Sequence, residues 1–515
     1  MASPTVTSLF PARYHSPALR GLVGLLLTVF LAAPGLAATP ALAAAGGSQK
    51  IDRQVALRLQ SGTPIKVMLI ARGDLTDVIQ DLHRQGFNRE VKRVPIVHGV
   101  STTMTAAAIQ YFAADPNVFR IVYDAPVQLM DTALNPVALA TAYPWTDDAV
   151  ALWSNPLAPL TGKGIGVAVI DSGVAPHPDF DNRVAVNLNF ASTATSPVDG
   201  YGHGTAVAGI IGGNGSASGG QYIGIAPEVT LLNLRVNDGT GAAGTSDIMN
   251  AILWAIINKD AYNVRVINLS LVSSIAESYT TSPLDAAVEY AWLKGIAVVV
   301  AAGNLGPNSA LYAPANDPYV ITVGATDDAG TVTPADDSLA SFSSYGVTQD
   351  GFAKPDLVVP GRHIISTAAA GSTIATTYPQ YLVGTQYVQL SGTSMAAPQV
   401  SGIAALYLEA HPGIRPAQLK GVLRTTAHGF GLLSTIPVGA GAGYADAAVA
   451  LDYNGTIGNV NAGLSPNNYL KVLFITVNQL IAGTTVSWDS VSWDSVSWGS
   501  VSWGDINWAA VSWGS

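Results

Sequence analysis

Three residues in this sequence have the side-chain types that acyl transfer needs. Asp171 ends the apolar run "GIGVAVID", His203 begins "HGTAVAG", and Ser394 lies in "GTSMAAP" ahead of a long apolar stretch. A neutral serine hydroxyl is a weak nucleophile, so a base must accept its proton, and histidine has a suitable pKa. A carboxylate on the other ring nitrogen would hold the imidazole in the correct tautomer. The three residues therefore form a candidate catalytic set.

Asn304, which directly follows "AVVVAAG", is a candidate for the fourth part of such a site. Its side-chain amide can donate to the oxyanion that develops during the attack, beside the backbone N–H of Ser394. Gly392 would let a substrate backbone pass close to the serine. Each residue alone has an ordinary structural interpretation, such as a serine that caps a helix N-terminus. Only the combination favours catalysis.

The segment that carries these residues, about 140–453, alternates between strand and helix patterns. Continuous apolar runs such as "GIGVAVID", "TLLNLRV", "RVINLSL", "IAVVVAAG" and "VITVGA" are typical of strands buried on both faces. Helix patterns such as "HGTAVAGII", "SDIMNAILWAIINK" and "LDAAVEYAWLKG" separate them. This order predicts an α/β fold with a doubly wound, mostly parallel sheet. Sites in such sheets form beyond the carboxyl ends of strands, where Asp171 and Asn304 are placed.

A smaller α+β unit precedes this segment, with its core over 65–129. Strand and helix patterns follow one another as β-α-β-β-α-β, from "IKVMLIA" to "FRIVYDAPVQL", which predicts a ferredoxin-like sandwich. The unit contains no obvious catalytic cluster.

The first 43 residues have the order of a secretory signal. Arg13 and Arg20 precede the apolar stretch "GLVGLLLTVFLAAPGLAA", and small residues follow. Cleavage is expected near Ala43, with Ala37 as the alternative. The apolar core is short for a membrane span, although an uncleaved N-terminal anchor is the other interpretation. The pattern predicts a secreted, extracellular protein.

Composition excludes some classes of partner. Charged residues make up 11% of the chain and the net charge is −10, which argues against nucleic acid because phosphate binding needs clustered Lys and Arg. The chain has no cysteine, so disulfides and thiolate metal sites are excluded.

The C-terminal residues 486–515 are a repeat, "VSWDSVSWDSVSWGSVSWGDINWAAVSWGS", after a predicted linker over 454–485. Tryptophan recurs every five residues. With this step, neither a strand nor a helix would place all the rings on one face. Two interpretations are open: a flexible extension, or attachment to a cell-surface polymer or another copy through exposed aromatic rings.

The four motifs "DSG", "HGT", "AAGN" and "GTSMAAP", in this order, resemble those of the subtilisin-like serine proteases, the subtilases. The resemblance covers about 140–453 and implies a serine endopeptidase acting on protein or peptide substrates through an acyl-enzyme. The preceding unit, 44–139, resembles the family's propeptide, which serves as an intramolecular chaperone and inhibitor. The resemblance also implies a zymogen that processes itself, with the cut between about Gln128 and Tyr143.

The resemblance places two walls around the substrate's P1 side chain. One is the strand Ser270–Leu271–Val272, and the other is Ala301–Ala302–Gly303. Subtilases usually have Ser-Leu-Gly-Gly in the first wall, whereas this chain has "SLVS". Val272 should narrow the P1 pocket and Leu305 makes its rim apolar, which predicts small to medium apolar P1 residues.

The chemistry itself requires no cofactor, but calcium is common in the family. Asp179 in "HPDF" matches one family ligand position, and the loop "GGNGSASGGQYIG" could add backbone oxygens for a hard cation. The alternative is that Asp179 is a turn residue without metal.

Two other functions remain to be compared. An α/β-hydrolase would need an acid and then a histidine after the serine, an order offered only by Glu409 with His411 or His428. A non-catalytic binding protein on the same fold would usually have lost a member of the catalytic set. Hydrolysis of casein, abolished by a serine-directed covalent inhibitor, separates these classes.

Overall fold

The computed structural model describes residues 50–87, 91–129, 142–153, 155, 158–192 and 194–471. The predicted signal segment, most of the predicted cleavage window and the tryptophan repeat lie outside these residues. Among the helices of the described residues, none has the length and apolarity to cross a membrane.

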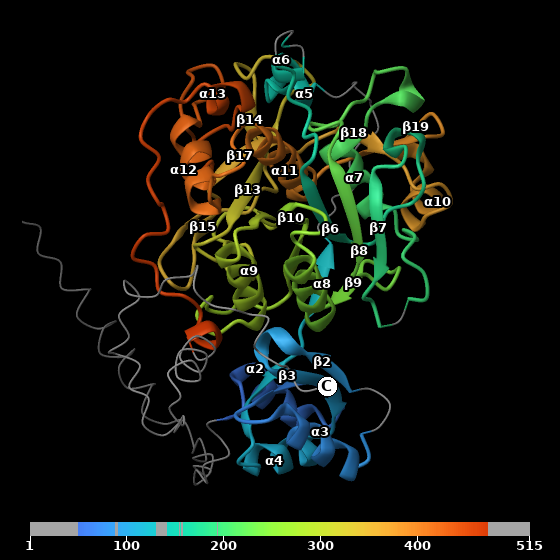
Figure 1. The fold of residues 1–515 in the computed structure, drawn as a ribbon, viewed down its shortest axis with the longest axis vertical. Coiled ribbons are helices and arrows are strands. Elements are labelled where there is room, and N and C mark those ends of the chain that lie inside the picture. Colours follow the sequence, from blue (N-terminus) through green and yellow to red (C-terminus); the bar gives the residue numbers. More distant parts are fainter. Residues whose placement is uncertain are drawn as a thin grey trace, which may run out of the picture. The chain divides into compact units, whose positions relative to one another are not determined.

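The N-terminal unit folds as the sequence pattern predicts. Its sheet has the order β2-β3-β1-β4 with antiparallel neighbours, and α3 and α4 connect its strands (Figure 1). This is the ferredoxin-like arrangement. The elements are α2 (Arg53–Arg58), β1 (Ile65–Ala71), α3 (Leu75–Arg84), β2 (Lys92–Val94), β3 (Gly99–Met104), α4 (Ala106–Ala114) and β4 (Val118–Tyr123).

Helix α3 shows why these residues form this unit. The side chain of Asp74 accepts a hydrogen bond from the backbone N–H of Thr76 at 2.8 Å and so caps the helix N-terminus. The apolar side chains of α3 recur at helical spacing and are buried in the unit's own core. The helix ends before Gly86, whose φ of +89° suits a glycine.

The larger unit is built on an eight-stranded sheet with the order β14-β13-β12-β10-β6-β8-β7, and β17 pairs with β13. All of its pairs are parallel except the one between β13 and β14. The predicted doubly wound, mostly parallel sheet is confirmed. Its strands are β6 (Gly166–Asp171), β7 (Val184–Asn189), β8 (Thr230–Arg235), β10 (Val264–Leu269), β12 (Ala297–Ala301), β13 (Ile321–Asp327), β14 (Ser338–Leu339) and β17 (Leu357–Pro360).

Two pairs of helices pack on this sheet: α8 contacts α9, and α7 contacts α11 (Figure 1). Helix α11 is buried along most of its length, because small residues such as Gly402 let it pass close to its neighbours. These helices are α7 (His203–Gly212), α8 (Thr245–Ile257), α9 (Pro283–Leu293) and α11 (Thr393–Ala410).

Strand β5 (Pro126–Leu129) follows β4 at the end of the N-terminal unit. Shorter elements complete the larger unit. They are α5 (Tyr143–Thr146), α6 (Ala149–Trp153), β9 (Ala242–Gly244), β11 (Leu271–Ser273), β15 (Gly346–Val347), β16 (Ala353–Lys354), β18 (Ile364–Thr367), α10 (Thr373–Thr377), β19 (Leu382–Val383), β20 (Tyr387–Leu390), α12 (Pro416–Thr426) and α13 (Ala447–Leu451).

The sequence predicted a linker over 454–485. For residues 454–471, the part that the structure describes, this prediction is wrong. Asn467 is fully buried, and its side-chain amide donates to the carbonyl oxygen of Ser282 at 2.8 Å and to that of Tyr279. The hydroxyl of Tyr279 in turn donates to the carbonyl of Ser465 at 2.9 Å. Polar "SPNNYL" has the composition of a loop, but its amides satisfy buried carbonyls at the start of α9. The folded unit therefore extends to at least Lys471.

Candidate active site

Asp171 and His203 meet where the end of β6 faces the start of α7. The Nδ1 atom of His203 lies 2.7 Å from Oδ1 of Asp171, and both side chains are fully buried. A Cβ on Gly204 would lie 2.3 Å from the carbonyl oxygen of Gly173 and 3.0 Å from the Asp171 side chain. Glycine at 204 therefore allows the close approach that makes the pair.

A further carboxylate, Asp199, holds this arrangement and was not foreseen from the sequence. Its Oδ1 accepts from the N–H of Gly202 at 2.7 Å and from Ser172 Oγ at 2.8 Å. Its Oδ2 accepts from the N–H and the hydroxyl of Thr205 at 2.9 and 2.6 Å. Burial raises the pKa of Asp199, and these hydrogen bonds act in the opposite direction. The sequence contained one signal of this role, because Asp199 lies just ahead of the start of α7.

Ser394 is the second residue of α11 and lies against the segment after β10. Its Oγ is 3.3 Å from the carbonyl oxygen of Ser270, and Ser270 Oγ donates to the carbonyl of Ser394 at 2.9 Å. Asn268 Nδ2 donates to Ser270 Oγ at 3.0 Å, and Ser401 Oγ donates to Asn268 Oδ1 at 2.8 Å. This buried chain of hydrogen bonds fixes α11 against β10, and with it the position of Ser394.

Asn304 is oriented so that its amide N–H groups remain for another partner. Its Oδ1 accepts from the N–H of Thr393 at 2.9 Å and from the Thr393 hydroxyl at 3.1 Å. Among the described residues, the buried Nδ2 of Asn304 has no hydrogen-bond partner. Thr393 Oγ1 also accepts from the N–H of Gly303 at 3.0 Å. A buried donor without a partner is costly, which is typical of a site that awaits an acceptor.

The two predicted walls of the P1 pocket face each other. Val272 lies in β11, while Ala301 ends β12 and Ala302 and Gly303 follow it; all three alanine and valine side chains are buried. A Cβ on Gly303, whose φ is +103°, would lie 4.0 Å from Cγ2 of Val272. Val272 therefore lies at van der Waals distance from the place that a Cβ at position 303 would take.

The residues around Asp179 do not fit a calcium ion. Its Oδ1 accepts from the N–H of Ala217 at 2.8 Å, and its Oδ2 accepts from the hydroxyl of Tyr387 at 2.9 Å. These donors would face a cation with their hydrogens. Over the described ranges, no cluster of three or more histidine, aspartate or glutamate side chains is arranged to hold a metal ion. No step below depends on calcium.

Strand β5, the last described part of the N-terminal unit, lies between two strands of the larger unit. It pairs antiparallel with β11 on one side and with β9 on the other, forming a three-stranded sheet. β11 carries the predicted substrate wall. The end of the small unit therefore pairs with the strand that directly follows Ser270, whose carbonyl oxygen lies 3.3 Å from Ser394 Oγ.

Fold and site together define a subtilisin-like architecture, and comparison with known proteins agrees. The subtilase family profile matches residues 162–459, more than half of the chain. The chain therefore belongs to the subtilase family.

Several proteins illustrate this relationship. Serine protease AprX of Bacillus subtilis (strain 168) is 42% identical over 271 residues, which are 52% of this chain and 61% of AprX. M-protease of Shouchella clausii (strain KSM-K16) is 33% identical over 342 residues, covering 66% of this chain and 76% of that protein. The crystal structure of fervidolysin from Fervidobacterium pennivorans superimposes with a TM-score of 0.58 at 24% identity, covering 77% of this chain and 62% of fervidolysin. This chain thus spans less than two thirds of AprX and of fervidolysin.

The family assignment confirms the predicted fold and the predicted subtilase family. It excludes the α/β-hydrolase alternative, and the structure gives Glu409 a different role. Glu409 Oε2 accepts from the backbone N–H groups of Thr161 and Gly162 at 2.9 and 2.7 Å. It therefore holds the loop before β6 instead of orienting a catalytic histidine.

Proposed function

We propose that this protein is a secreted serine endopeptidase that is made as a zymogen and processes itself. The observation that carries the proposal is the buried Asp171–His203 pair, 2.7 Å apart, together with Asn304, whose amide nitrogen lacks a partner within the described chain. Two of its relatives, serine protease AprX and M-protease, are named as proteases, which supports the same activity.

In the proposed reaction, His203 accepts the proton of Ser394 Oγ as this oxygen attacks the carbonyl carbon of the substrate. Asp171, bonded at Nδ1, keeps Nε2 as the proton acceptor and stabilises the imidazolium that forms. Asn304 Nδ2 donates to the oxyanion, and the buried setting strengthens this interaction. His203 then gives its proton to the leaving amine, and water hydrolyses the acyl-enzyme. No cofactor takes part.

The zymogen proposal rests on how the N-terminal unit contacts α8. The N-cap residue of α8, Gly244, has no side chain that could accept from the first N–H groups of the helix. Asp124 of the N-terminal unit accepts from the N–H and hydroxyl of Ser246 at 3.1 and 2.9 Å. Lys92 pairs with Asp247 on the same helix. The small unit thus supplies a cap for α8, which supports a role as an intramolecular chaperone.

Secretion and the role of the C-terminal repeat rest on sequence alone. Residues 1–43 have the order of charge, apolar core and small residues that directs export. The tryptophans of 486–515 would bind a cell-surface polymer through exposed rings. Deletion of 486–515 should leave peptide hydrolysis intact and lower retention on the producing cell.

The proposed substrates are proteins or peptides with small to medium apolar P1 residues. Val272 supports this preference because it places a branched side chain where the family usually has glycine, 4.0 Å from the place that a Cβ at position 303 would take. Val272→Gly should raise kcat/KM for a phenylalanine P1 peptide relative to an alanine P1 peptide. Preference of the unaltered enzyme for phenylalanine or glutamate would contradict the proposal.

The central test is casein hydrolysis by the purified protein, with and without a serine-directed covalent inhibitor. We expect hydrolysis by the unaltered protein, its loss with the inhibitor, and no hydrolysis by Ser394→Ala. Casein hydrolysis by Ser394→Ala would remove Ser394 from the mechanism. A folded protein that binds peptides and never cleaves them would favour the binding-protein alternative.

A further inference from the structure

Arg235, the last residue of β8, is buried and donates hydrogen bonds to two separate segments of the chain. It is 6% exposed, and in the parallel pairing of β6 with β8 it lies opposite Asp171. Its Nε donates to the carbonyl oxygen of Asn237 at 3.0 Å. Its Nη1 donates to the carbonyls of Ser196 and Val198 at 2.9 and 2.5 Å. A guanidinium carries its donors on one rigid plane, so Arg235 can fix the distance between the two segments.

The first segment, 196–198, leads directly to Asp199. This carboxylate accepts from the backbone N–H groups of Gly202 and Thr205 at 2.7 and 2.9 Å. In the sequence, Gly202 and Thr205 lie on either side of His203. The position of 196–198 therefore bears on the position of His203 through a single buried carboxylate.

The second segment begins at Asn237 and turns into β9. The N–H of Asp238 donates to the carbonyl of Ala242 at 2.9 Å, and Asn237 forms a bridge with Ala243. β9 pairs with β5, where Val127 lies opposite Ala243. The second segment therefore supports a strand whose free backbone groups hold an extended chain.

Under the proposed function, an extended substrate takes the position that β5 has in this structure. β5 also pairs with β11, and Ser270, directly before β11, has its carbonyl oxygen 3.3 Å from Ser394 Oγ. A substrate that adds as a strand between β11 and β9 would use the same backbone groups. The residues before its cleaved bond would then pair with β9.

We infer that Arg235 is a positioning residue that links β9, the strand beside the substrate, to His203. The inference rests on the proposed function. When a peptide pairs with β9, the guanidinium holds Asn237 and the segment 196–198 at one distance, and Asp199 passes this constraint on to His203. Binding energy from the remote part of the substrate would then help to orient the reacting groups, which raises kcat. A short substrate that does not reach β9 would not benefit from this link.

The experiment compares two peptide substrates with the same P1 residue and the same leaving group. One has four residues before the cleaved bond, and the other has a single residue there. The enzyme is produced from the full chain, and its active sites are counted with a serine-directed covalent inhibitor, so that unfolded molecules do not contribute to kcat. In Arg235→Met we expect kcat on the long substrate to fall by about tenfold or more, and kcat on the short substrate to change by less than about twofold.

Arg265→Met is the matched control. Arg265 also donates its guanidinium to two loop carbonyls, those of Pro412 and Ile414, at 2.8 and 3.2 Å. This variant should change kcat on both substrates by less than about twofold. Arg235→Lys is the second test variant, because it keeps the positive charge if methionine prevents folding. A single ammonium group cannot reproduce the planar fork, so its kcat on the long substrate should also fall.

A double-mutant cycle tests the route of the link. If the constraint passes through Asp199, Arg235→Met should have little further effect on the long substrate in an Asp199→Asn background. Additive effects in this cycle would contradict the route through Asp199.

Two kinetic results would overturn the inference and leave the proposed function in place. An equal fall of kcat on both substrates would show that Arg235 holds His203 without linking it to β9. An unchanged kcat per active site on the long substrate would limit Arg235 to a role in folding. Absence of hydrolysis of both substrates by the unaltered enzyme would instead remove the proposed function.

Discussion

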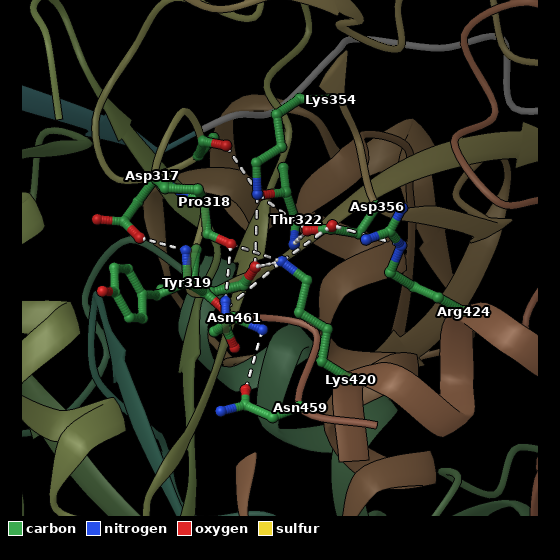
Figure 2. A network of polar contacts seen from close by, with 12 residues as sticks. Asp317, Pro318, Tyr319, Thr322, Lys354, Asp356, Lys420, Arg424, Asn459 and Asn461 are labelled. Carbon is green, nitrogen blue, oxygen red and sulfur yellow. Dashed lines mark hydrogen bonds and ion pairs between the residues drawn. The ribbon is translucent and has the colours of Figure 1, made fainter. Parts of the chain in front are cut away.

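Two buried aspartates lie at strand ends of the large sheet, and the groups that they contact differ in charge. Asp171 ends β6 and has one titratable base, His203, at 2.7 Å. Asp356, directly before β17, is bonded at 2.9 Å to each of two ammonium groups, those of Lys354 and Lys420 (Figure 2). The first pair joins a carboxylate to an imidazole, the side chain that most often serves as a catalytic base. The second holds its carboxylate between two ammonium groups.

The charged groups of the cluster around Asp356 also use most of their hydrogen-bonding capacity. Asp356 Oδ2 accepts from the N–H of Thr322 at 2.9 Å, and Lys420 donates to the carbonyls of Pro318 and Val320 at 2.9 and 2.7 Å. Burial alone would raise the pKa of Asp356, but the two ammonium groups outweigh burial and lower this pKa to about 2. In the active site, by contrast, Asn304 Nδ2 has no partner among the described residues. A satisfied cluster stabilises the fold, and an incomplete one can bind a transition state.

The largest expected effect is on catalysis. Asp171→Asn should lower kcat by about 10⁴-fold, roughly 5.5 kcal/mol, because the amide favours the wrong tautomer of His203. Urea unfolding, measured in a Ser394→Ala background to prevent self-digestion, should change little. If Asp171→Asn lowered the stability and left kcat per folded molecule unchanged, Asp171 would have a structural role and not a catalytic one.

The next effect is on stability. Asp356→Asn would leave two buried ammonium groups without a carboxylate, which should lower the free energy of unfolding by about 3–5 kcal/mol. Lys420→Met is the matched control, because it keeps the pair between Lys354 and Asp356 and should cost less. Equal stability of Asp356→Asn and the unaltered chain in urea would show that the cluster is dispensable.

A comparable effect on catalysis is expected at Asn304. Asn304→Leu should lower kcat by about 10²–10³-fold, about 3–4 kcal/mol, the usual effect of removing one oxyanion-hole donor, with KM little changed. Steady-state kinetics on a peptide substrate measures both constants. An unchanged kcat would exclude the Asn304 amide as an oxyanion donor.

The smallest effect concerns pH and a third aspartate. Burial, together with the charges of Asp328 and Asp336, raises the pKa of Asp337 to about 8. A carboxyl whose pKa is raised on folding contributes stability below its usual pKa, and this contribution is lost as pH rises through about 8. Asp337→Asn should therefore be the more stable form at pH 9, by at least about 1 kcal/mol. Unfolding midpoints at pH 5 and pH 9 measure this, and an equal pH response of both proteins would contradict it.

Sequence patterns predicted the fold and the positions of the main site residues because strand ends converge. Asp171 ends strand β6 and Asn304 comes shortly after strand β12. Because both strands belong to one parallel sheet, the placement of the two residues at one edge follows from topology. The partners that orient the site were missed. Thr393 and Asp199 are ordinary helix-start residues in the sequence, and only their contacts reveal their role. The same holds for Asn467, whose buried amide made a predicted linker part of the domain.

By itself, the sequence determined the element order and the subtilase family, and it predicted which residues would carry the chemistry. These features depend on local periodicity and on motifs of a few adjacent residues. Only the tertiary structure decided which polar groups are left without a partner, and how β5 is registered against β11. It also brought Lys420 to Asp356 across 64 positions of the sequence (420 − 356). Such contacts depend on Ångström-scale distances between segments far apart in the chain, and residue type alone does not encode those distances.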